Sequence, residues 1–441
     1  MERREVTRWA MYSWANHGWV TTVGTVLIGP WLLSLATSAA GSGSATLVAI
    51  GPLALSAAAY PSFMITVASL LQVVFLPMFG AAADARGHRR RLLSWTCGLG
   101  ALISVLLATT GGDAWLYAGV LFLLGTIVFG ATDVVYNSFL PYLVPPERRD
   151  WASGRGFALG YLGAGLLLAL NLAMLQFHEV VGVDRETAVR LCFASAGVWW
   201  AGFGFWAIAG VREHGEVLSP EHRRPSRTGL RELRAVLAEL RGMPQAIRFL
   251  IAFLFIADGV SAVTTLASTY ITHEIFDSDA SAAATFLFAL ILMIQFVAVG
   301  GSVLWARVSP RLGTKRTIMV MLVLWCGVVV YAYAAMRTQA EAVVLGLVIG
   351  LVIGGTQSLT RALFSQLIPR GRESAFFGLY AIVDKGTSWV APLLFTVIVN
   401  ATGSFRQAIL SLILMFLVGI VVLARTDIDR ARAEAVSTPP A

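Results

Sequence analysis

The stretch Gly130–Arg148 reads GATDVVYNSFLPYLVPPER, and it returns without gaps as GGTQSLTRALFSQLIPRGR at Gly354–Arg372. The copies share glycine, threonine, leucine, proline and arginine at equivalent positions. Ala15-Asn16 corresponds to Ala257-Asp258 once a longer central loop is allowed for, and a basic loop after residue 80 has a degenerate copy after residue 308. Duplicated halves of this kind are typical of carriers whose binding site lies between the halves.

The composition shows in which solvent these halves fold. Of 441 residues, 57% belong to the hydrophobic types (AVILMFWYC) and only 13% are charged. Soluble domains are about 45–50% apolar and 25% charged, so an ordinary soluble enzyme is excluded. A membrane-spanning helix needs about 20 mostly apolar residues. Breaks in the pattern give twelve such stretches, near 9–36, 57–83, 92–110, 114–140, 153–176, 188–210, 246–273, 281–308, 315–336, 341–367, 374–400 and 404–425.

The predicted fold class is therefore an all-α membrane protein with twelve transmembrane helices in two pseudo-symmetric six-helix halves. We predict an N-terminal half, a basic linker, a C-terminal half and a tail, at residues 1–210, 211–245, 246–425 and 426–441. Within the linker, residues 228–241 carry leucines on one side and arginines on another. This spacing predicts an amphipathic helix, which either lies on the membrane surface or forms a solvated connection.

The basic residues predict the orientation in the membrane. Of 33 Lys and Arg residues, only four fall in loops on the side opposite the termini: Arg185, Arg190, Arg337 and Arg406. By the positive-inside rule, both termini are cytoplasmic. The abundance of arginine and alanine indicates a bacterial source, so we expect a multi-pass protein of the cell (cytoplasmic) membrane.

Charged residues inside the predicted spans indicate a site, because a charge in the bilayer is retained where it is paired or faces a wet cavity. Asp133 and Asn137 are spaced i,i+4 and share a helix face. The repeat places Gln357 and Arg361 at the equivalent positions of the other half. An acid and a base at matched depth predict a central polar site that binds substrate or gates the pathway. A purely structural ion pair is the alternative.

Other polar residues lie at similar depth. Asp258 has Asn16 as its repeat counterpart, next to His17, which fits a core histidine. We predict that Asp258 carries a coupling proton and that Asn16 contacts substrate; the alternative for Asp258 is a permanent hydrogen bond to the first span. Asp384 and Lys385 are sequence neighbours, about 100° apart on a helix, so each needs another partner. We predict proton coupling for Asp384 and substrate binding for Lys385.

The basic loop after the second predicted span reads GAAADARGHRRR from Gly80. It resembles the Gly-x-x-x-Asp-Arg-x-Gly-Arg-Arg loop of the major facilitator superfamily, as do the twelve spans and the six-plus-six repeat. The resemblance implies a cytoplasmic gate that latches the halves, formed by Asp84, Arg86, Arg89 and Arg90. Ala85 stands where that family usually has arginine.

A narrower resemblance covers most of the chain. Its motifs are WAMYSWAN at Trp9–Asn16, YNSFLP at Tyr136–Pro141, GYLG at Gly160–Gly163, GGTQSLTRALF at Gly354–Phe364, FGLY at Phe377–Tyr380, and Lys385. Together they resemble the vacuole-effluxer-like (autophagy-related amino-acid effluxer) branch, whose fungal members are implicated in exporting neutral amino acids from the vacuole. This chain departs from the branch at two positions. Ser13 stands where the branch often has aspartate, and Asp384 stands where a small residue often precedes the lysine.

These patterns favour a secondary active transporter that moves a small polar solute by alternating access, coupled to protons. The resemblance implies neutral amino acids or related metabolites. A drug efflux pump and a non-transporting membrane sensor or scaffold are the alternatives. The sequence has no nucleotide-binding, hydrolase or zinc motif, so we expect no enzyme activity, no cofactor and no metal. The expected partners are substrate, protons and membrane lipid without nucleic acid, and the expected state is a monomer.

Overall fold

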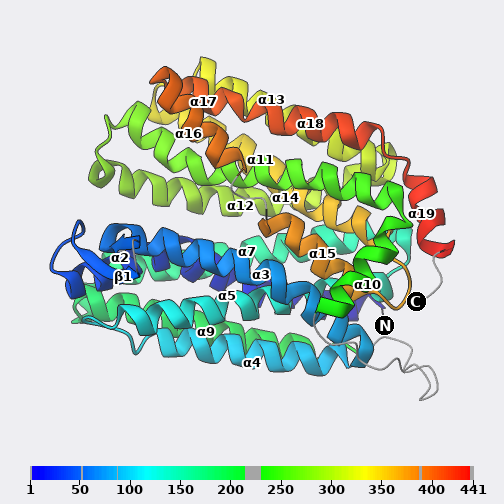
Figure 1. The fold of residues 1–441 in the computed structure, drawn as a ribbon, viewed down its shortest axis with the longest axis horizontal. Helices are drawn as coiled ribbons and strands as arrows, with labels where there is room; N and C mark the ends of the chain where they lie inside the picture. The colour runs from blue at the N-terminus through cyan, green and yellow to red at the C-terminus, as the bar shows by residue number, and fades with distance from the viewer. Residues whose placement is uncertain (1, 51–52, 87, 214–229, 387–389, 438–441) are drawn as a thin grey trace.

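The computed structural model describes residues 2–50, 53–86, 88–213, 230–386 and 390–437. It consists of two helical bundles side by side (Figure 1). The N-terminal bundle contains α1 (Glu2–Trp19), the π-helix η1 (Val20–Leu27), α2 (Ile28–Ala40), α3 (Tyr60–Arg86), α4 (Arg89–Leu107), α5 (Trp115–Ser138), α6 (Leu140–Leu143), α7 (Arg149–Gln176), α8 (His178–Val181) and α9 (Arg185–Ala209). Two short 3-10 helices, η2 (Ala57–Ala59) and η3 (Pro146–Arg148), precede α3 and α7.

The linker contributes α10 (Leu230–Arg241). The C-terminal bundle contains α11 (Pro244–Ile275), α12 (Ala280–Leu312), α13 (Thr314–Ala334), α14 (Gln339–Ser365), α15 (Glu373–Gly386), α16 (Val390–Thr402), α17 (Phe405–Ser411) and α18 (Ile413–Ala424), and α19 (Ile428–Ser437) follows it. Within the described residues, eleven segments are long and apolar enough to cross a membrane. The expected span near 374–400 covers α15 and α16, and residues 387–389 between them lie outside the described part of the structure.

Each bundle buries its own apolar core. Trp9, Trp19 and Trp200 are fully buried in the N-terminal bundle, and Trp325 and Phe416 are fully buried in the C-terminal one. The two bundles also meet through close helix packing. Gly154 on α7 and Gly354 on α14 both face α12, where Ala306 and Ser302 leave no room for a methyl group. Small residues thus let α12 approach a helix of each half.

A β-hairpin differs from the all-helical prediction. The strands β1 (Thr46–Ile50) and β2 (Leu53–Ser56) pair antiparallel between α2 and α3. Thr46, Val48 and Ile50 are β-branched residues at alternate positions, which is a strand pattern. A search for 20-residue apolar stretches passes over so short a segment.

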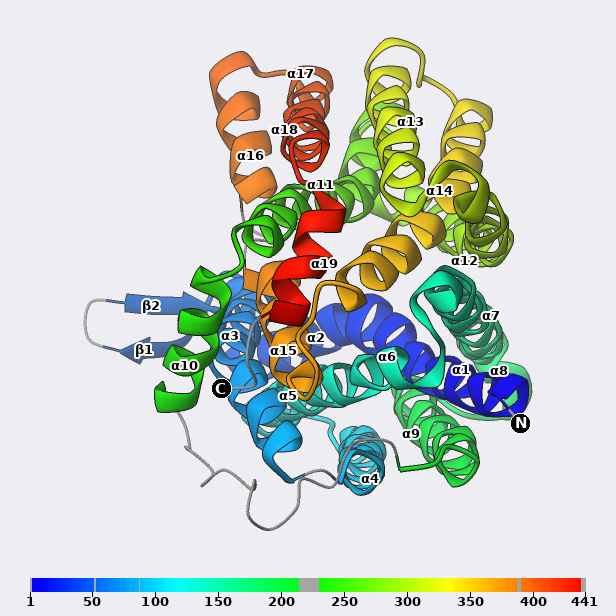
Figure 2. The same ribbon diagram turned by 90° about the vertical axis from the view of Figure 1, so that its right-hand side faces the viewer.

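The two bundles approach each other at the end that carries both termini and diverge toward the opposite end (Figure 1). We call these the termini end and the far end. Helices α10 and α19 lie across the termini end (Figure 2). Hydrogen bonds between the halves join Asp84 to Ser374 and Arg149 to Ser365 on this side. The structure is therefore closed at its termini end.

Candidate functional site

Arg361 on α14 joins the two halves. Its Nη1 donates to Oδ1 of Asn137 on α5 at 3.0 Å. Its Nε and Nη2 donate to the hydroxyl and the carbonyl of Ser153 on α7 at 2.9 and 3.0 Å. Arg361 and Asn137 occupy the same position in the two repeats. Their contact therefore lies on the pseudo-twofold axis that relates the halves.

A second guanidinium joins equivalent positions one helical turn further along. Arg149 donates to the carbonyl of Ser365 at 2.7 Å and to that of Pro141 at 3.3 Å. Ser365 and Pro141 also occupy the same position in the two repeats. Arg361 and Arg149 thus both lie near the pseudo-twofold axis, and each of them contacts both halves.

The other two residues of the predicted i,i+4 pairs lie on either side of this contact. Asn137 donates to Oδ2 of Asp133 at 2.8 Å, so a hydrogen-bonded chain runs from Arg361 to the Asp133 carboxylate. Gln357, the repeat counterpart of Asp133, accepts a hydrogen bond from the Tyr161 hydroxyl at 2.5 Å. The structure therefore brings Asp133, Asn137 and Arg361 together, and it connects Gln357 to α7.

Aromatic rings enclose the Arg361 guanidinium. Its central carbon lies 4.3 Å from the ring centroid of Phe157, 5.2 Å from that of Trp9 and 5.5 Å from that of Tyr136. Arg361 is 3% exposed. A cation that is removed from water in this way interacts strongly with ring faces and with hydrogen-bond acceptors. Arg361 is thus a shielded cation, held by neutral groups, at the junction of the halves.

Asn16 is buried on α1, one turn after Tyr12, which contacts Tyr136 of α5. Neither polar atom of the Asn16 amide has a hydrogen-bond partner among the described residues. A buried amide in this condition can still accept and donate hydrogen bonds to a bound molecule. His17 Nδ1 lies 2.9 Å from the Ser13 hydroxyl, which agrees with the core histidine expected from the sequence.

Asp258 has a partner other than the first span. Its Oδ2 accepts a hydrogen bond from the backbone N–H of Ala391 at 2.9 Å, at the N-terminus of α16. A helix N-terminus stabilises a carboxylate through its free N–H groups and its dipole. Asp258 is 1% exposed, whereas Asp384 is partly exposed. The side chain of Lys385 lies outside the described part of the structure.

The predicted gate is built around Asp84 at the end of α3. Its carboxylate accepts hydrogen bonds from the backbone N–H groups of Ser374 and Ala375 at 3.0 and 2.8 Å. These residues form the first turn of α15, so Asp84 of one half binds the N-terminus of a helix of the other. Arg89 lies 2.8 Å from the same carboxylate.

Arg89 extends the gate to Glu373, the first residue of α15, with Nη2 at 2.9 Å from Oε2. The Tyr142 hydroxyl donates to Oε2 at 2.7 Å, and the Tyr142 ring lies 4.7 Å from the Arg89 guanidinium. The side chains of Asp84, Arg89 and Glu373 are at most 4% exposed. A cation between two buried carboxylates therefore holds the termini end closed.

Arg86 and Arg90 are the other two residues predicted for the gate. The side chain of Arg86 lies outside the described part of the structure. Arg90 is exposed, and its backbone N–H donates to the carboxylate of Glu213 at 3.1 and 3.2 Å. Of the four residues expected in the gate, Asp84 and Arg89 thus meet at the interface between the halves.

The other interface at this end has its own acidic contact. Asp150 at the start of α7 accepts hydrogen bonds from the hydroxyls of Ser309 and Thr314, the latter at 2.6 Å. Asp150 and Ser374 are repeat equivalents. The acid therefore lies at the end of α3 at one interface (Asp84) and at the start of α7 at the other (Asp150).

Sequence reasoning missed several residues of these networks. Three of them, Tyr142, Asp150 and Glu373, lie inside the repeated segment or within two residues of it. Their polarity beside predicted span ends was the available signal. Tyr161 gave a weaker signal, because it entered only as part of the GYLG motif at Gly160–Gly163, and Ser153 lies in none of the motifs considered above.

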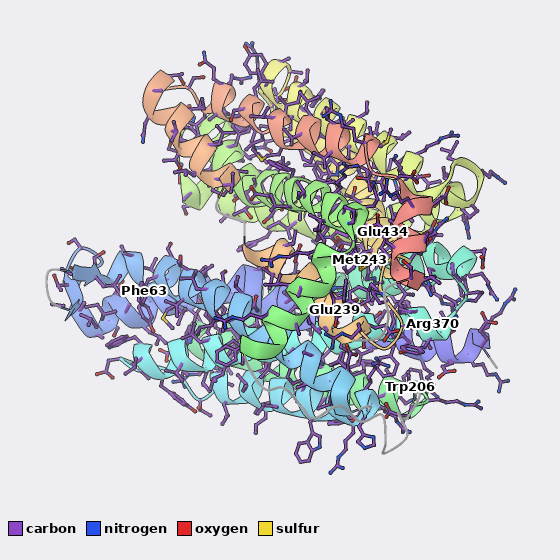
Figure 3. All side chains as sticks on the ribbon, turned by 45° about the vertical axis from the view of Figure 1, so that its right-hand side comes forward. Phe63, Trp206, Glu239, Met243, Arg370 and Glu434 are labelled. Carbon is purple, nitrogen blue, oxygen red and sulfur yellow. The ribbon has the colours of Figure 1, made fainter. Side chains whose placement is uncertain are left out.

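Helix α10 packs on the protein next to the gate. Glu239 contacts the Arg372 guanidinium through both carboxylate oxygens at 2.8 Å, and Val236 is fully buried. Figure 3 shows Glu239 beside the loop that carries Arg370. The helix is amphipathic, and these contacts fix one side of it to the protein. Arg372, which directly precedes the gate residue Glu373, offers a buried charge partner.

We expect Glu239→Gln to loosen the termini end. The substitution removes the charge from a nearly buried bidentate pair, and hydrogen bonds to charged groups contribute about 1.5–3 kcal/mol. Hydrogen–deuterium exchange in a peptide covering residues 371–380 should become about tenfold faster. Glu147→Gln, at an exposed position of the same end, is the matched control. Unchanged exchange in Glu239→Gln would show that α10 does not support the gate.

Solved structures identify the fold. The human organic anion transporter MFSD10 aligns with 96% of this chain and 99% of its own, with a TM-score of 0.68 and 14% identity. The E. coli fucose:proton symporter FucP aligns with 97% of this chain and 98% of its own, with a TM-score of 0.69 and 12% identity. The fold is that of the major facilitator superfamily, as the resemblance of the loop and the repeat implied.

Sequence comparison then gives the family. A family model described as "Vacuole effluxer Atg22 like" matches residues 1–436, and the chain belongs to this family. The Bacillus subtilis uncharacterized MFS-type transporter YxiO is 27% identical over 96% of this chain and 94% of its own length. Autophagy-related protein 22 of Cryptococcus neoformans is 31% identical over 64% of this chain, which is 54% of that protein. The protein is thus a multi-pass membrane transporter.

Proposed function

We propose that this protein is a proton-coupled secondary transporter of small polar solutes that carry a carboxylate, with neutral amino acids or related metabolites as substrates. The observation that carries the proposal is the shielded Arg361 cation at the junction of the halves, hydrogen-bonded to Asn137 and Ser153. Membership of the vacuole effluxer family supports a transport role, and neutral amino acids are the substrates that the resemblance of the sequence motifs implies. A fixed, planar guanidinium suits bidentate recognition of a carboxylate.

In the proposed site, Asn16, Asp133, Asn137, Gln357, Arg361 and Lys385 contact the substrate. The substrate carboxylate replaces Asn137 and Ser153 as the hydrogen-bond acceptor of the Arg361 guanidinium. The Asp133 carboxylate, at the other end of the chain of hydrogen bonds, attracts the ammonium group of the substrate. Because Asn137 and Ser153 belong to the N-terminal half and Arg361 to the C-terminal half, this exchange of partners weakens the contact between the halves. Substrate binding thereby favours the change of access.

The gate gives the proposed cycle its two states. The present structure, with Asp84 and Arg89 engaged, corresponds to the state that is closed at the termini end. Opening that end requires the contacts to Ser374 and Glu373 to break. We place the termini end in the cytoplasm of a bacterial cell, as the distribution of basic residues predicts, and we treat the functional unit as a monomer.

Uptake by purified protein in proteoliposomes tests this function. A labelled panel should contain neutral amino acids, their methyl esters and amphipathic cations, each with and without a proton gradient. We expect gradient-dependent transport of the amino acids, and poor transport of the esters because they lack the carboxylate. Transport of the cations alone would favour a drug efflux pump, for which the rings of Trp9, Tyr136 and Phe157 would form the binding surface. Absence of transport for the whole panel would contradict the proposal.

Proton coupling is proposed at Asp258, with Asp384 as the second candidate. Asp258→Asn keeps an acceptor oxygen for the Ala391 N–H but cannot release a proton. The variant should lose gradient-driven accumulation and retain exchange of labelled for unlabelled substrate. Asp277→Asn, in the far-end turn where asparagine tolerates a φ of 47°, is the control. Accumulation at the wild-type level in Asp258→Asn would remove Asp258 from the coupling mechanism.

A further inference from the structure

A hollow at the termini end lies outside the transport site. It has a volume of about 510 Å³ and is lined by Arg248, Val422 and Arg425. Arg248 lies one turn into α11, and Arg425 directly follows the last residue of α18. We propose that this hollow binds the headgroup phosphate of an anionic phospholipid, and that the acyl chains of the same lipid lie along α18.

The charges in the hollow fit a phosphate. Among the described residues, neither the Arg248 nor the Arg425 guanidinium takes part in an ion pair or a hydrogen bond, and both side chains are exposed. Nearby, Lys315 donates to the carbonyls of Ala424 and Thr426 at 2.9 and 2.7 Å. It therefore satisfies the last carbonyl of α18 and one just beyond the helix, and it adds a third positive charge near the hollow. Two free guanidinium forks can bind one phosphate in a bidentate manner.

The surface next to the hollow fits acyl chains. Leu414, Leu417 and Val421 on α18 are exposed by 50%, 47% and 48%. Together with Arg425 they are spaced by three, four and four residues, so they share one face of the helix. Ile251 on α11, 41% exposed, continues the apolar surface beside Arg248. An apolar stripe thus runs along the helix and ends at a cation.

The length of this stripe points to a lipid and not to a free anion. Leu414 and Arg425 are eleven residues apart, which is about 16 Å along a helix. Half of a hydrocarbon core of about 30 Å is nearly the same distance. The stripe therefore matches the acyl region of a single leaflet, with the arginines at the level of its phosphates.

The test measures lipid binding by the purified full-length protein in detergent. Native mass spectrometry counts bound lipid, and thermal unfolding records the stabilisation that a ligand of the folded state produces. The probes are phosphatidylglycerol, phosphatidylcholine and inorganic phosphate. We expect one phosphatidylglycerol molecule to bind more tightly than phosphatidylcholine and to raise the melting temperature. Inorganic phosphate at millimolar concentration should neither compete nor stabilise.

Variants connect this binding to the hollow. Each basic side chain near a membrane surface contributes about 1 kcal/mol toward anionic lipid, so Arg248→Gln and Arg425→Gln should each weaken phosphatidylglycerol binding about fivefold. Arg311→Gln, exposed at the same end and in the same half, should bind as the wild type does. Both variants change exposed side chains, and an unaltered melting temperature without lipid confirms that they fold.

Three results would overturn the proposal. Wild-type affinity in the double variant Arg248→Gln/Arg425→Gln would show that the lipid binds elsewhere. An equal loss in Arg311→Gln would indicate attraction by net charge without a site. Effective competition by inorganic phosphate would make the hollow a site for free anions. None of these results depends on the transported substrate, so the transport proposal stands or fails separately.

Discussion

Arg361→Lys is expected to reduce transport at least tenfold in a protein that still purifies as a single species. Lysine keeps the positive charge but cannot reproduce the planar fork that reaches Asn137 and both oxygen atoms of Ser153. A buried acceptor that loses its donor costs about 1–3 kcal/mol. Loss of these hydrogen bonds therefore weakens both the contact between the halves and the proposed binding site for the substrate carboxylate.

Two readouts separate these effects. Uptake of an amino acid is compared with uptake of its methyl ester, and thermal stability is recorded alongside. If Arg361 binds the substrate carboxylate, the preference for the acid over the ester should shrink in the variant. Arg337→Lys, exposed at the far end, is the control for a generic effect of the exchange. An unchanged preference, together with reduced stability, would leave Arg361 as a structural connection between the halves.

Arg89→Gln is expected to open the termini end. Removal of the guanidinium leaves the carboxylates of Asp84 and Glu373 buried without their cation. Breaking a buried ion pair in this way typically costs about 3–5 kcal/mol. The conformation with this end open, in which water reaches both carboxylates, should therefore gain population. Asp84→Asn should have a smaller effect, because its side chain still accepts one of the two backbone hydrogen bonds from α15.

Hydrogen exchange and transport measure this shift. The amides of Ser374 and Ala375, which donate to Asp84, should exchange at least a hundredfold faster in Arg89→Gln, and turnover should fall. Arg91→Gln, an exposed arginine two residues away, is the matched control. Wild-type protection of these amides in Arg89→Gln would show that the gate does not depend on the ion pair.

Much of the architecture follows from the sequence, because spans and repeats depend on patterns that extend over many residues. The duplicated segment also located Asn137 and Arg361 at matched depth, and the structure joins them directly. What the sequence did not reveal depends on contacts between distant segments. The roles of Glu373 and Tyr142 exist only because the start of α15 meets α4 and α6. The position of α10 depends in the same way on distant partners, among them Arg372.

The direct contact between Asn137 and Arg361 also bears on how such a molecule can arise. In a symmetric dimer of identical six-helix units, each residue on the twofold axis faces its own copy. Arginine would then face arginine, with two like charges in a site closed to water, or asparagine would face asparagine, with no cation at all. The hydrogen bond from Arg361 to Asn137 requires units that differ at this one position. Fusion of two copies into a single chain makes that difference heritable, so this arginine on the axis is a feature that an ancestral homodimer could not have possessed.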